Sequence, residues 1–192
     1  IAIFSDITEK KLAEKQIRDL AYYDSLTGLA NRRLLLDRLE QAFSTAKRKH
    51  TFGAVIFLDL DKFKILNDSL GHHIGDELLI QVADRIKNNI RQEDTACRLG
   101  GDEFVVLISN TAESLKQVAN QATDVAEKIR IAINQPYQLA GSEQLFSTSI
   151  GVSLFPEETN NAQAILQQAD TAMYLSKETG RNTINFFRPS MQ

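Results

Sequence analysis

Four acidic residues stand where runs of apolar residues end or begin. Asp59 and Asp61 close one such run, while Asp102 and Glu103 follow two glycines and precede another. Side chains alternate along a strand, so Asp59 and Asp61 should share one face if the first run is a strand. If the two runs are neighbouring strands of one sheet, the carboxylates should converge at one edge.

Carboxylates gathered in this way suit a divalent cation and a phosphate-bearing substrate. Mg²⁺ prefers hard oxygen ligands and usually takes one or two protein carboxylates together with phosphate oxygens. A pair of such ions can polarise a phosphoryl group, activate an attacking oxygen and neutralise a leaving group. The alternative is that these acidic residues simply face water at strand ends and turns, and Asp59 alone does not distinguish the two.

Hydrophobic periodicity predicts the elements that must position these carboxylates. Strands are expected over residues 52–60, 96–99, 104–108, 148–154 and 183–186, with a short hairpin around Gly141-Ser142. Helices are expected over residues 33–49, 114–134 and 162–177, and another through the apolar repeat Ile74, Leu78, Val82, Ile86 and Ile90. The pair Gly100-Gly101 indicates a tight hairpin turn. Helices mixed with hairpins predict an α+β fold, in which helices flank a central antiparallel-rich sheet.

The composition limits the class of protein. The 192 residues are 43% hydrophobic and carry a formal net charge of −3. These values fit a globular chain with a sizeable core, exclude intrinsic disorder and argue against a nucleic-acid partner. One cysteine excludes an internal disulfide and, with three histidines, disfavours a structural zinc site. Short apolar runs and the lack of a signal-peptide pattern favour a cytoplasmic location, in a parent chain that could still carry a membrane anchor.

The first 20 residues differ in character from the rest. Residues 1–4 are apolar like the end of a strand, and Asp6 is a good helix N-cap. Ala13, Ile17 and Leu20 then form a narrow apolar seam, which is typical of a connecting or pairing helix. The alternative is a solvated helix that packs on its own domain.

Five short segments resemble the motifs of a known family. Residues 100–104, Gly-Gly-Asp-Glu-Phe, match the signature of the GGDEF family of diguanylate cyclases. Residues 24–33, 59–68, 71–76 and 177–182 resemble its other motifs and occur in the same order. The resemblance covers about residues 21–186, which we take as a GGDEF diguanylate cyclase domain. Residues 1–20 resemble the end of a PAS sensor domain with its linker helix, and residues 187–192 would be a C-terminal linker.

The resemblance implies a fold akin to nucleotidyl-cyclase and polymerase-palm catalytic domains, and it implies a reaction. Two GTP molecules would condense into cyclic di-GMP and two pyrophosphates. The cofactor would be Mg²⁺ or Mn²⁺, held by Asp59, Asp102, Glu103 and the Leu60 carbonyl. Asp59, Asp102 and Glu103 form the expected catalytic set, in which Glu103 lies beside the reacting 3′-hydroxyl as a metal ligand or a general base. Each site would hold one GTP, so the active species would be a homodimer.

Other motif residues would bind the substrate. By resemblance they are Asn67 and Asp76 at guanine, Lys64, Lys177 and Arg181 at the phosphates, and Gly100 and Gly101 where the backbone approaches the nucleotide. Each has a structural alternative. Asn67 could cap or turn the chain, and Asp76 could be an acid favoured by a helix N-terminus. Lys177 and Arg181 could be a solvated pair at a helix end.

A second site is expected just ahead of the hairpin. Arg91 and Asp94 end the preceding helix and resemble the family's RxxD motif, which implies an inhibitory site for the product. A guanidinium can grip phosphate or stack on a base, and a carboxylate can accept guanine N–H groups. The alternative is a cation favoured by the helix C-terminal dipole. The sequence does not assign a second arginine to this site.

The sequence therefore predicts a Mg²⁺-dependent diguanylate cyclase domain, active as a homodimer and inhibited by cyclic di-GMP. The main alternative is a non-catalytic module that binds GTP or cyclic di-GMP and regulates an adjacent phosphodiesterase domain. Residues 186–191 resemble the segment that often leads to a phosphodiesterase of the Glu-Ala-Leu type, so such a neighbour is compatible with either reading. A sensor-coupled dimerisation module would account for the N-terminal helix but not for the acidic cluster.

Overall fold

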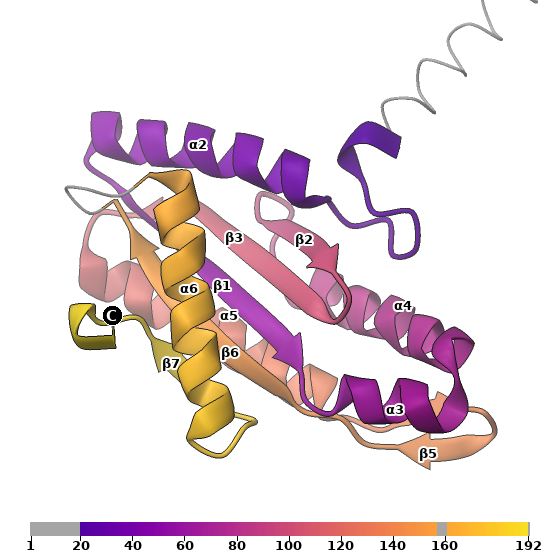
Figure 1. The fold of residues 1–192 in the computed structure, drawn as a ribbon. Helices are drawn as coiled ribbons and strands as arrows, with labels where there is room; N and C mark the ends of the chain where they lie inside the picture. The colour runs from indigo at the N-terminus through magenta and orange to yellow at the C-terminus, as the bar shows by residue number, and fades with distance from the viewer. Residues whose placement is uncertain (1–19, 157–160, 192) are drawn as a thin grey trace, which may run out of the picture.

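The computed structural model describes residues 20–156 and 161–191, and Figure 1 shows a twisted sheet with helices packed on it. The central sheet has five strands in the order β2-β3-β1-β6-β7. Neighbouring strands are antiparallel except for β6 and β7, which are parallel. The predicted α+β fold with an antiparallel-rich central sheet is confirmed.

The elements follow one another along the chain much as the periodicity predicts. The strands are β1 (Phe52–Leu60), β2 (Thr95–Gly100), β3 (Glu103–Ala112), β4 (Tyr137–Leu139), β5 (Ser142–Gln144), β6 (Thr148–Phe155) and β7 (Ile184–Phe186). The helices are α2 (Arg32–Lys49), α3 (Phe63–Leu70), α4 (His72–Asn88), α5 (Leu115–Ile133), α6 (Ala162–Glu178) and a 3-10 turn at Pro189–Met191. Strands β4 and β5 form a separate hairpin.

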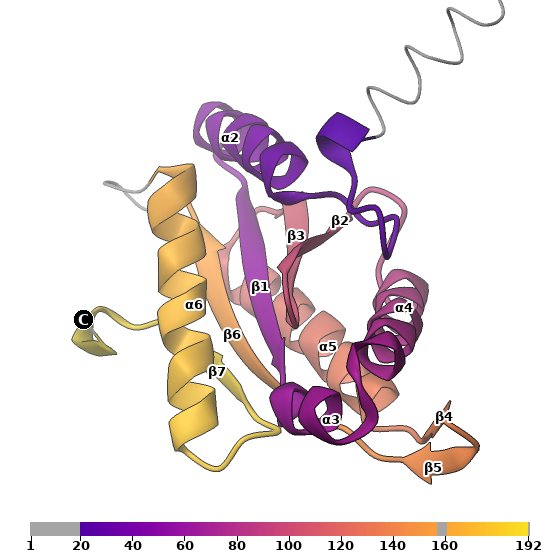
Figure 2. The same cartoon turned by 45° about the vertical axis from the view of Figure 1, so that its right-hand side comes forward.

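Strand β1 runs through the middle of the sheet and is buried on both faces. Its residues Ile56 and Leu58 pack with the apolar sides of α4 and α5, whereas Val55 and Phe57 pack with those of α2 and α6. Figure 2 shows these helix pairs on opposite faces of the sheet. Because side chains alternate along a strand, Asp59 continues the face that α2 and α6 cover.

Helix α6 lies close against β6, and a glycine makes this approach possible. A Cβ atom at Gly151 would collide with the backbone of α6 at Ala169 and Met173. The helix begins at the N-cap Asn161, whose side chain accepts the Ala164 N–H at 2.9 Å. This packing fixes the height of α6 above the sheet, and with it the position of Lys177 in the last turn.

Two sequence expectations need correction, and a third concerns residues that the structure does not describe. The periodicity did not predict α3, and helix α4 ends at Asn88, so Arg91 lies beyond the helix rather than at its end. The expected N-terminal helix lies almost wholly outside the described residues. Among the helices of the described part of the chain, none is long and apolar enough to span a membrane.

Candidate functional site

The end of β1 and the start of β3 bring three carboxylates to one edge of the sheet. Asp59 and Glu103 are direct cross-strand partners, and the Leu60 N–H donates to the Asp102 carbonyl at 3.4 Å. Cross-strand partners project from the same face, so Glu103 also lies on the side that α6 covers. The structure therefore places Asp59, Asp102, Glu103 and the backbone of Leu60 together.

Helix α6 supplies a cation to this cluster. The Lys177 Nζ lies 2.7 Å from the Asp59 Oδ2, and the Asp59 side chain is only 9% exposed. Burial raises the pKa of Asp59 to about 6, Lys177 opposes that rise, and the charges of Asp102 and Glu103 add to it. Burial also raises the pKa of Glu103. The cluster thus holds more negative charge than the single lysine neutralises, which favours a bound cation.

The donor set fits a cation that is shared with a phosphate ligand. Within residues 20–156 and 161–191, no group of three or more histidine, cysteine or acidic side chains is arranged to hold a metal ion unaided. Mg²⁺ needs only one or two protein carboxylates when phosphate oxygens and water complete its octahedron. Asp59, Asp102 and Glu103 are oxygen donors of that kind, so the residues present fit Mg²⁺ or Mn²⁺ held jointly with a nucleotide.

Asp61 does not join the cluster, although it shares the face of Asp59. Its carboxylate is 4% exposed and accepts hydrogen bonds from the hydroxyls of Ser147 (2.6 Å) and Ser149 (2.7 Å). It also accepts the backbone N–H of Asn182 at 3.2 Å. The expectation that all the acidic residues at this edge converge is wrong for Asp61, because its oxygens are taken by β6 and by the turn after α6.

The helices α3 and α4 place a buried amide beside Asp76. The Asn67 Oδ1 is buried and has no hydrogen-bond partner among the described residues. A Cβ atom at Gly75, the residue before Asp76, would collide with that oxygen. An unpaired buried acceptor costs about 1–3 kcal/mol, and here the oxygen packs against the backbone of α4 at Gly75. The carboxylate of Asp76 is exposed on the first turns of α4.

The other expected phosphate-binding cations lie on exposed positions near the carboxylates. Lys64 is exposed on α3, and Arg181 is exposed in the turn that follows α6. No ion pair involving either residue is found in the described part of the chain. Their charges are therefore available to an anionic ligand, whereas that of Lys177 is shared with Asp59.

The hairpin turn next to the cluster is open and anchored. Gly100 and Gly101 have φ values of 145° and 52°, and a Cβ atom at either would meet no atom within 4 Å. The Arg98 guanidinium donates to the Gly101 carbonyl at 2.9 Å and pairs with Asp24 at 3.1 Å. The turn is thus fixed from behind by the segment that precedes α2, while its outer side is free for a ligand.

A hollow of about 380 Å³ adjoins Glu103, and the sequence did not point to it. Its polar lining includes Arg32, Gln163, Gln167 and Asp170. The charge of Asp170 contributes to the raised pKa of Glu103, after burial. Asp170 stands seven residues before Lys177, two turns away on the same side of α6, and that spacing is the signal that could have found it.

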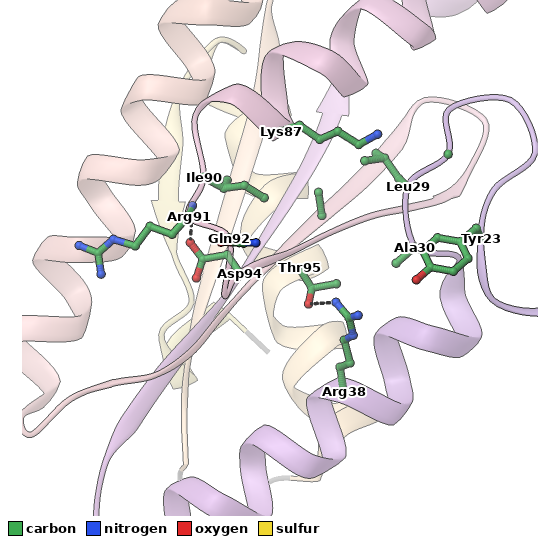
Figure 3. Close-up of a pocket in the computed structure, with 12 residues that line it drawn as sticks. Tyr23, Leu29, Ala30, Arg38, Lys87, Ile90, Arg91, Gln92, Asp94 and Thr95 are labelled. Atoms are coloured by element: carbon green, nitrogen blue, oxygen red, sulfur yellow. Dashed lines mark hydrogen bonds between the residues drawn. The ribbon is translucent and has the colours of Figure 1, made fainter. Parts of the chain in front are cut away.

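The residues of the expected inhibitory site lie at a second hollow, away from the carboxylates. This hollow of about 440 Å³ is lined by Arg38, Lys87, Arg91 and Asp94, with apolar residues of the segment before α2 (Figure 3). The Asp94 carboxylate accepts the Arg91 N–H at 3.0 Å and keeps its other oxygen buried and unpaired within the described residues. Arg38 donates to the Thr95 hydroxyl at 2.8 Å.

Comparisons with known proteins agree with this geometry. Residues 21–183 match the family described as "Diguanylate cyclase, GGDEF domain". The chain is 48% identical over 179 residues to the bifunctional diguanylate cyclase/cyclic di-GMP phosphodiesterase MucR of Pseudomonas aeruginosa, covering 93% of this chain and 25% of MucR. The chain thus spans about a quarter of that relative.

Solved structures share the fold as well as the sequence. The GGDEF domain of TpbB (YfiN) from Pseudomonas aeruginosa superposes with a TM-score of 0.82 at 37% identity, covering 88% of this chain and 96% of that one. The coiled coil and GGDEF domain of DgcB from Caulobacter crescentus, in complex with c-di-GMP, has a TM-score of 0.85 at 26% identity and covers 96% of this chain and 95% of that one. With the carboxylate edge, the open glycine turn and these matches together, the chain belongs to the GGDEF family of diguanylate cyclase domains.

Proposed function

We propose that this domain condenses two GTP molecules into cyclic di-GMP and two pyrophosphates. The observation that carries the proposal is the edge where Asp59 and Glu103 pair across two strands, beside the open turn of Gly100 and Gly101. Family membership supports the same reaction. In phosphoryl transfer the protein mainly positions groups and stabilises charge, and the described site is built from such groups.

Each part of GTP has a matching group in this proposal. The Asn67 amide and the Asp76 carboxylate bind the guanine edge, while Lys64, Lys177 and Arg181 bind the phosphates. Mg²⁺ or Mn²⁺, held by Asp59, Asp102 and the Leu60 carbonyl, would supply charge neutralisation at the reacting phosphate, which leaves Glu103 to act as the general base. The close contact of Asn67 with Gly75, the residue before Asp76, supports a joint role for the two side chains.

Glu103 handles the proton in the proposed reaction. The 3′-oxygen of one GTP forms a bond to the α-phosphorus of the other, and the bond from that phosphorus to pyrophosphate breaks. The proton of the 3′-hydroxyl passes to the Glu103 carboxylate, and the step occurs twice per cyclic product. Burial, and then the charges of Asp170 and Asp102, raise the pKa of Glu103. The raised pKa supports this role, because a general base works best when its pKa lies near the pH of the reaction.

Two copies of the domain are needed in this proposal, because each site binds one GTP and the product joins two. The domain would act as a homodimer whose sites face one another. GTP is a cytoplasmic nucleotide, so the proposed activity implies a cytoplasmic location. The name of MucR couples cyclase and phosphodiesterase activities in one protein, and the chain covers a quarter of it, which supports flanking domains in a parent chain.

The hollow of Arg91 and Asp94 would bind the product and inhibit the enzyme. The cations Arg38 and Lys87 on its lining suit a phosphate ester. The complex of DgcB with c-di-GMP supports the product as a ligand of this fold. Arg38 is the nearest described candidate for a second arginine at this site.

Incubation of the protein with GTP and Mg²⁺ tests the proposal directly. We expect cyclic di-GMP and pyrophosphate in a ratio of one to two, at protein concentrations where dimers are detected. The alternative, a non-catalytic module that binds GTP or cyclic di-GMP and regulates a neighbouring phosphodiesterase, predicts nucleotide binding without pyrophosphate release. Binding without turnover by a proven dimer would therefore replace the first function with the second.

A further inference from the structure

The turn after α6 has an unusual backbone. Gly180, Arg181 and Asn182 have φ values of 123°, 62° and 50°, so three successive residues lie in the left-handed region. This conformation costs roughly 1–2 kcal/mol for each residue other than glycine. Arg181 and Asn182 therefore keep it only because surrounding groups hold them there.

Three elements hold the turn, the first of them α6 itself, whose Ser176 carbonyl accepts the Arg181 N–H at 3.0 Å. The Asp61 carboxylate at the end of β1 accepts the Asn182 N–H at 3.2 Å, and Arg130 of α5 donates to the Asn182 Oδ1 at 2.9 Å. Arg130 is itself paired with Glu127 at 2.7 Å. Figure 2 shows the turn after α6 next to the end of β1. The conformation of Arg181 is thus held directly by α6, and through its neighbour Asn182 by Asp61 and α5.

Both oxygens of the Asp61 carboxylate act as acceptors. One oxygen accepts the Ser149 hydroxyl, and the other accepts both the Ser147 hydroxyl and the Asn182 N–H. An asparagine keeps one acceptor oxygen without the negative charge and turns the other position into a donor, so the Ser149 hydroxyl would have to reverse its direction and the Asn182 N–H would lose a charged acceptor. With both oxygens occupied and 4% of its surface exposed, Asp61 is a structural acceptor and not a free ligand.

Asp59 and Asp61 together anchor the same stretch of chain at two points. Asp59 pairs with Lys177 in the last turn of α6, and Asp61 binds Asn182 in the turn that follows. Asp59 is the last residue but one of β1, and Asp61 directly follows the strand. The end of β1 and the residue after it therefore contact the chain on both sides of the end of α6.

We infer that Asp61 is a positioning residue, which fixes the turn 180–182 through the Asn182 N–H and so aims Arg181 at the phosphates of the bound nucleotide. The inference rests on the proposed function, since it assigns Arg181 to GTP. It adds a residue that touches neither the nucleotide nor the metal and acts through the backbone of the turn. Asp61→Asn should consequently weaken binding of the triphosphate and not of the base.

Binding of two probes, measured by calorimetry with Mg²⁺, separates these effects. 3′-Deoxy-GTP carries the triphosphate but has no 3′-hydroxyl to react, and GMP lacks the outer phosphates. We expect Asp61→Asn to lower the affinity for 3′-deoxy-GTP by about tenfold, the scale of one lost charge-assisted hydrogen bond. The affinity for GMP should stay unchanged. The control Ser149→Ala removes a different partner of the same carboxylate, leaves the Asn182 bond in place and should bind both probes like the wild type.

A double-mutant cycle with Arg181→Ala decides whether Asp61 acts through Arg181. In the Arg181→Ala background, Asp61→Asn should cause no further loss of 3′-deoxy-GTP affinity. Equal losses in both backgrounds, or an equal loss of GMP, would overturn the inference. Such results differ from failure of the proposed function, in which the wild-type protein binds neither probe.

Hydrogen exchange of the wild-type protein tests the anchor even if Asp61→Asn fails to fold. The Asn182 amide should exchange slowly, like core amides, because its N–H is bonded to a buried carboxylate. Exchange as fast as that of an unprotected surface amide would contradict the anchor and the inference with it.

Discussion

At the scale of single residues, Asp59 faces opposing requirements. Cation binding needs its carboxylate charged, yet burial and the charges of Asp102 and Glu103 raise its pKa from the ordinary 3.8 to about 6. The ion pair with Lys177 offsets only part of that rise. Such a group is costly to the fold without its ligand, which is a common property of functional sites.

A pH titration of stability measures this cost. The native state binds the Asp59 proton more tightly than the unfolded chain, so stability should fall as pH rises through the window from 3.8 to about 6 and level off above it. Asp59→Asn lacks this titration. Urea unfolding of both metal-free proteins across the window should show the wild type losing stability relative to the variant with rising pH. A constant difference would refute the shifted pKa.

Glu103→Gln should abolish synthesis and leave GTP binding largely intact. The amide keeps the size of the side chain but cannot accept the proton of the 3′-hydroxyl, and loss of a general base typically costs 10²–10⁴-fold in rate. Product formation and binding of 3′-deoxy-GTP measure the two effects separately. Turnover comparable to that of the wild type would remove Glu103 from the proton transfer.

The sequence could predict some of these residues and not others for a physical reason. Asp59, Asp102 and Glu103 belong to short motifs whose local spacing carries the signal. The role of Asp61 depends on Ser147, Ser149 and Asn182, the last 121 positions away along the chain. Contacts of that kind come from the packing of β1, β6 and the turn after α6, which no local pattern specifies.

At the scale of elements, strong hydrophobic periodicity predicted strand β1 well, but no such pattern predicted the short helix α3. Strand β1 coincides with the predicted run 52–60, because every position from Gly53 on is buried and apolar until the acid. Helix α3 was missed: it spans only eight residues, its N-cap Lys62 makes no side-chain cap, and few of its residues are buried. Its position depends on packing against α4 rather than on its own sequence.

The close contact of α6 with β6 leads to a prediction at this scale. Gly151→Ala places a Cβ against the backbone of α6, which cannot give way as a flexible side chain could. We expect a loss of about 1–3 kcal/mol in the free energy of unfolding, together with weaker nucleotide binding as Lys177 moves. Urea unfolding and 3′-deoxy-GTP binding measure the two losses.

A second substitution on β6 serves as the control for that prediction. Ser153→Ala removes one buried hydroxyl, bonded to Gln168 at 2.9 Å, without adding volume between strand and helix. It should leave nucleotide affinity unchanged. A Gly151→Ala protein as stable as the wild type, with the same affinity, would show that α6 is not held at a fixed height.

At the scale of the whole molecule, the positions of the charged residues matter more for ligand binding than the net charge does. The formal net charge of −3 argues against a broad nucleic-acid surface, yet it hides a cluster of acids and two sets of cations. One set lies around the carboxylate edge, and the other lines the hollow of Arg91 and Asp94. An anionic ligand can therefore bind at either place without a basic protein.

The two places are connected by continuous contacts. The segment before α2 lines the second hollow through Leu29 and Ala30, and Asp24 of the same segment pairs with Arg98. Arg98 also donates to the Gly101 carbonyl in the turn beside the carboxylates. A ligand in the second hollow would thus press on the segment that anchors the hairpin turn.

Product inhibition should depend on the second hollow if cyclic di-GMP binds there. Arg91→Ala removes a guanidinium that is 60% exposed and lies 3.9 Å from the Glu93 carboxylate, while the Asp94 carboxylate keeps its bond to the Arg91 backbone N–H. We expect the concentration of cyclic di-GMP that halves the rate to rise by about tenfold or more, the scale of one charged contact. Rates measured with and without added product give that ratio whatever the basal rate is. Glu93→Gln removes the acidic partner of that guanidinium but leaves Arg91 and Asp94 in place, so it should be inhibited at least as strongly as the wild type. If Arg91→Ala were inhibited at the wild-type concentration, the product would have to act at the carboxylate edge itself, by competing with GTP.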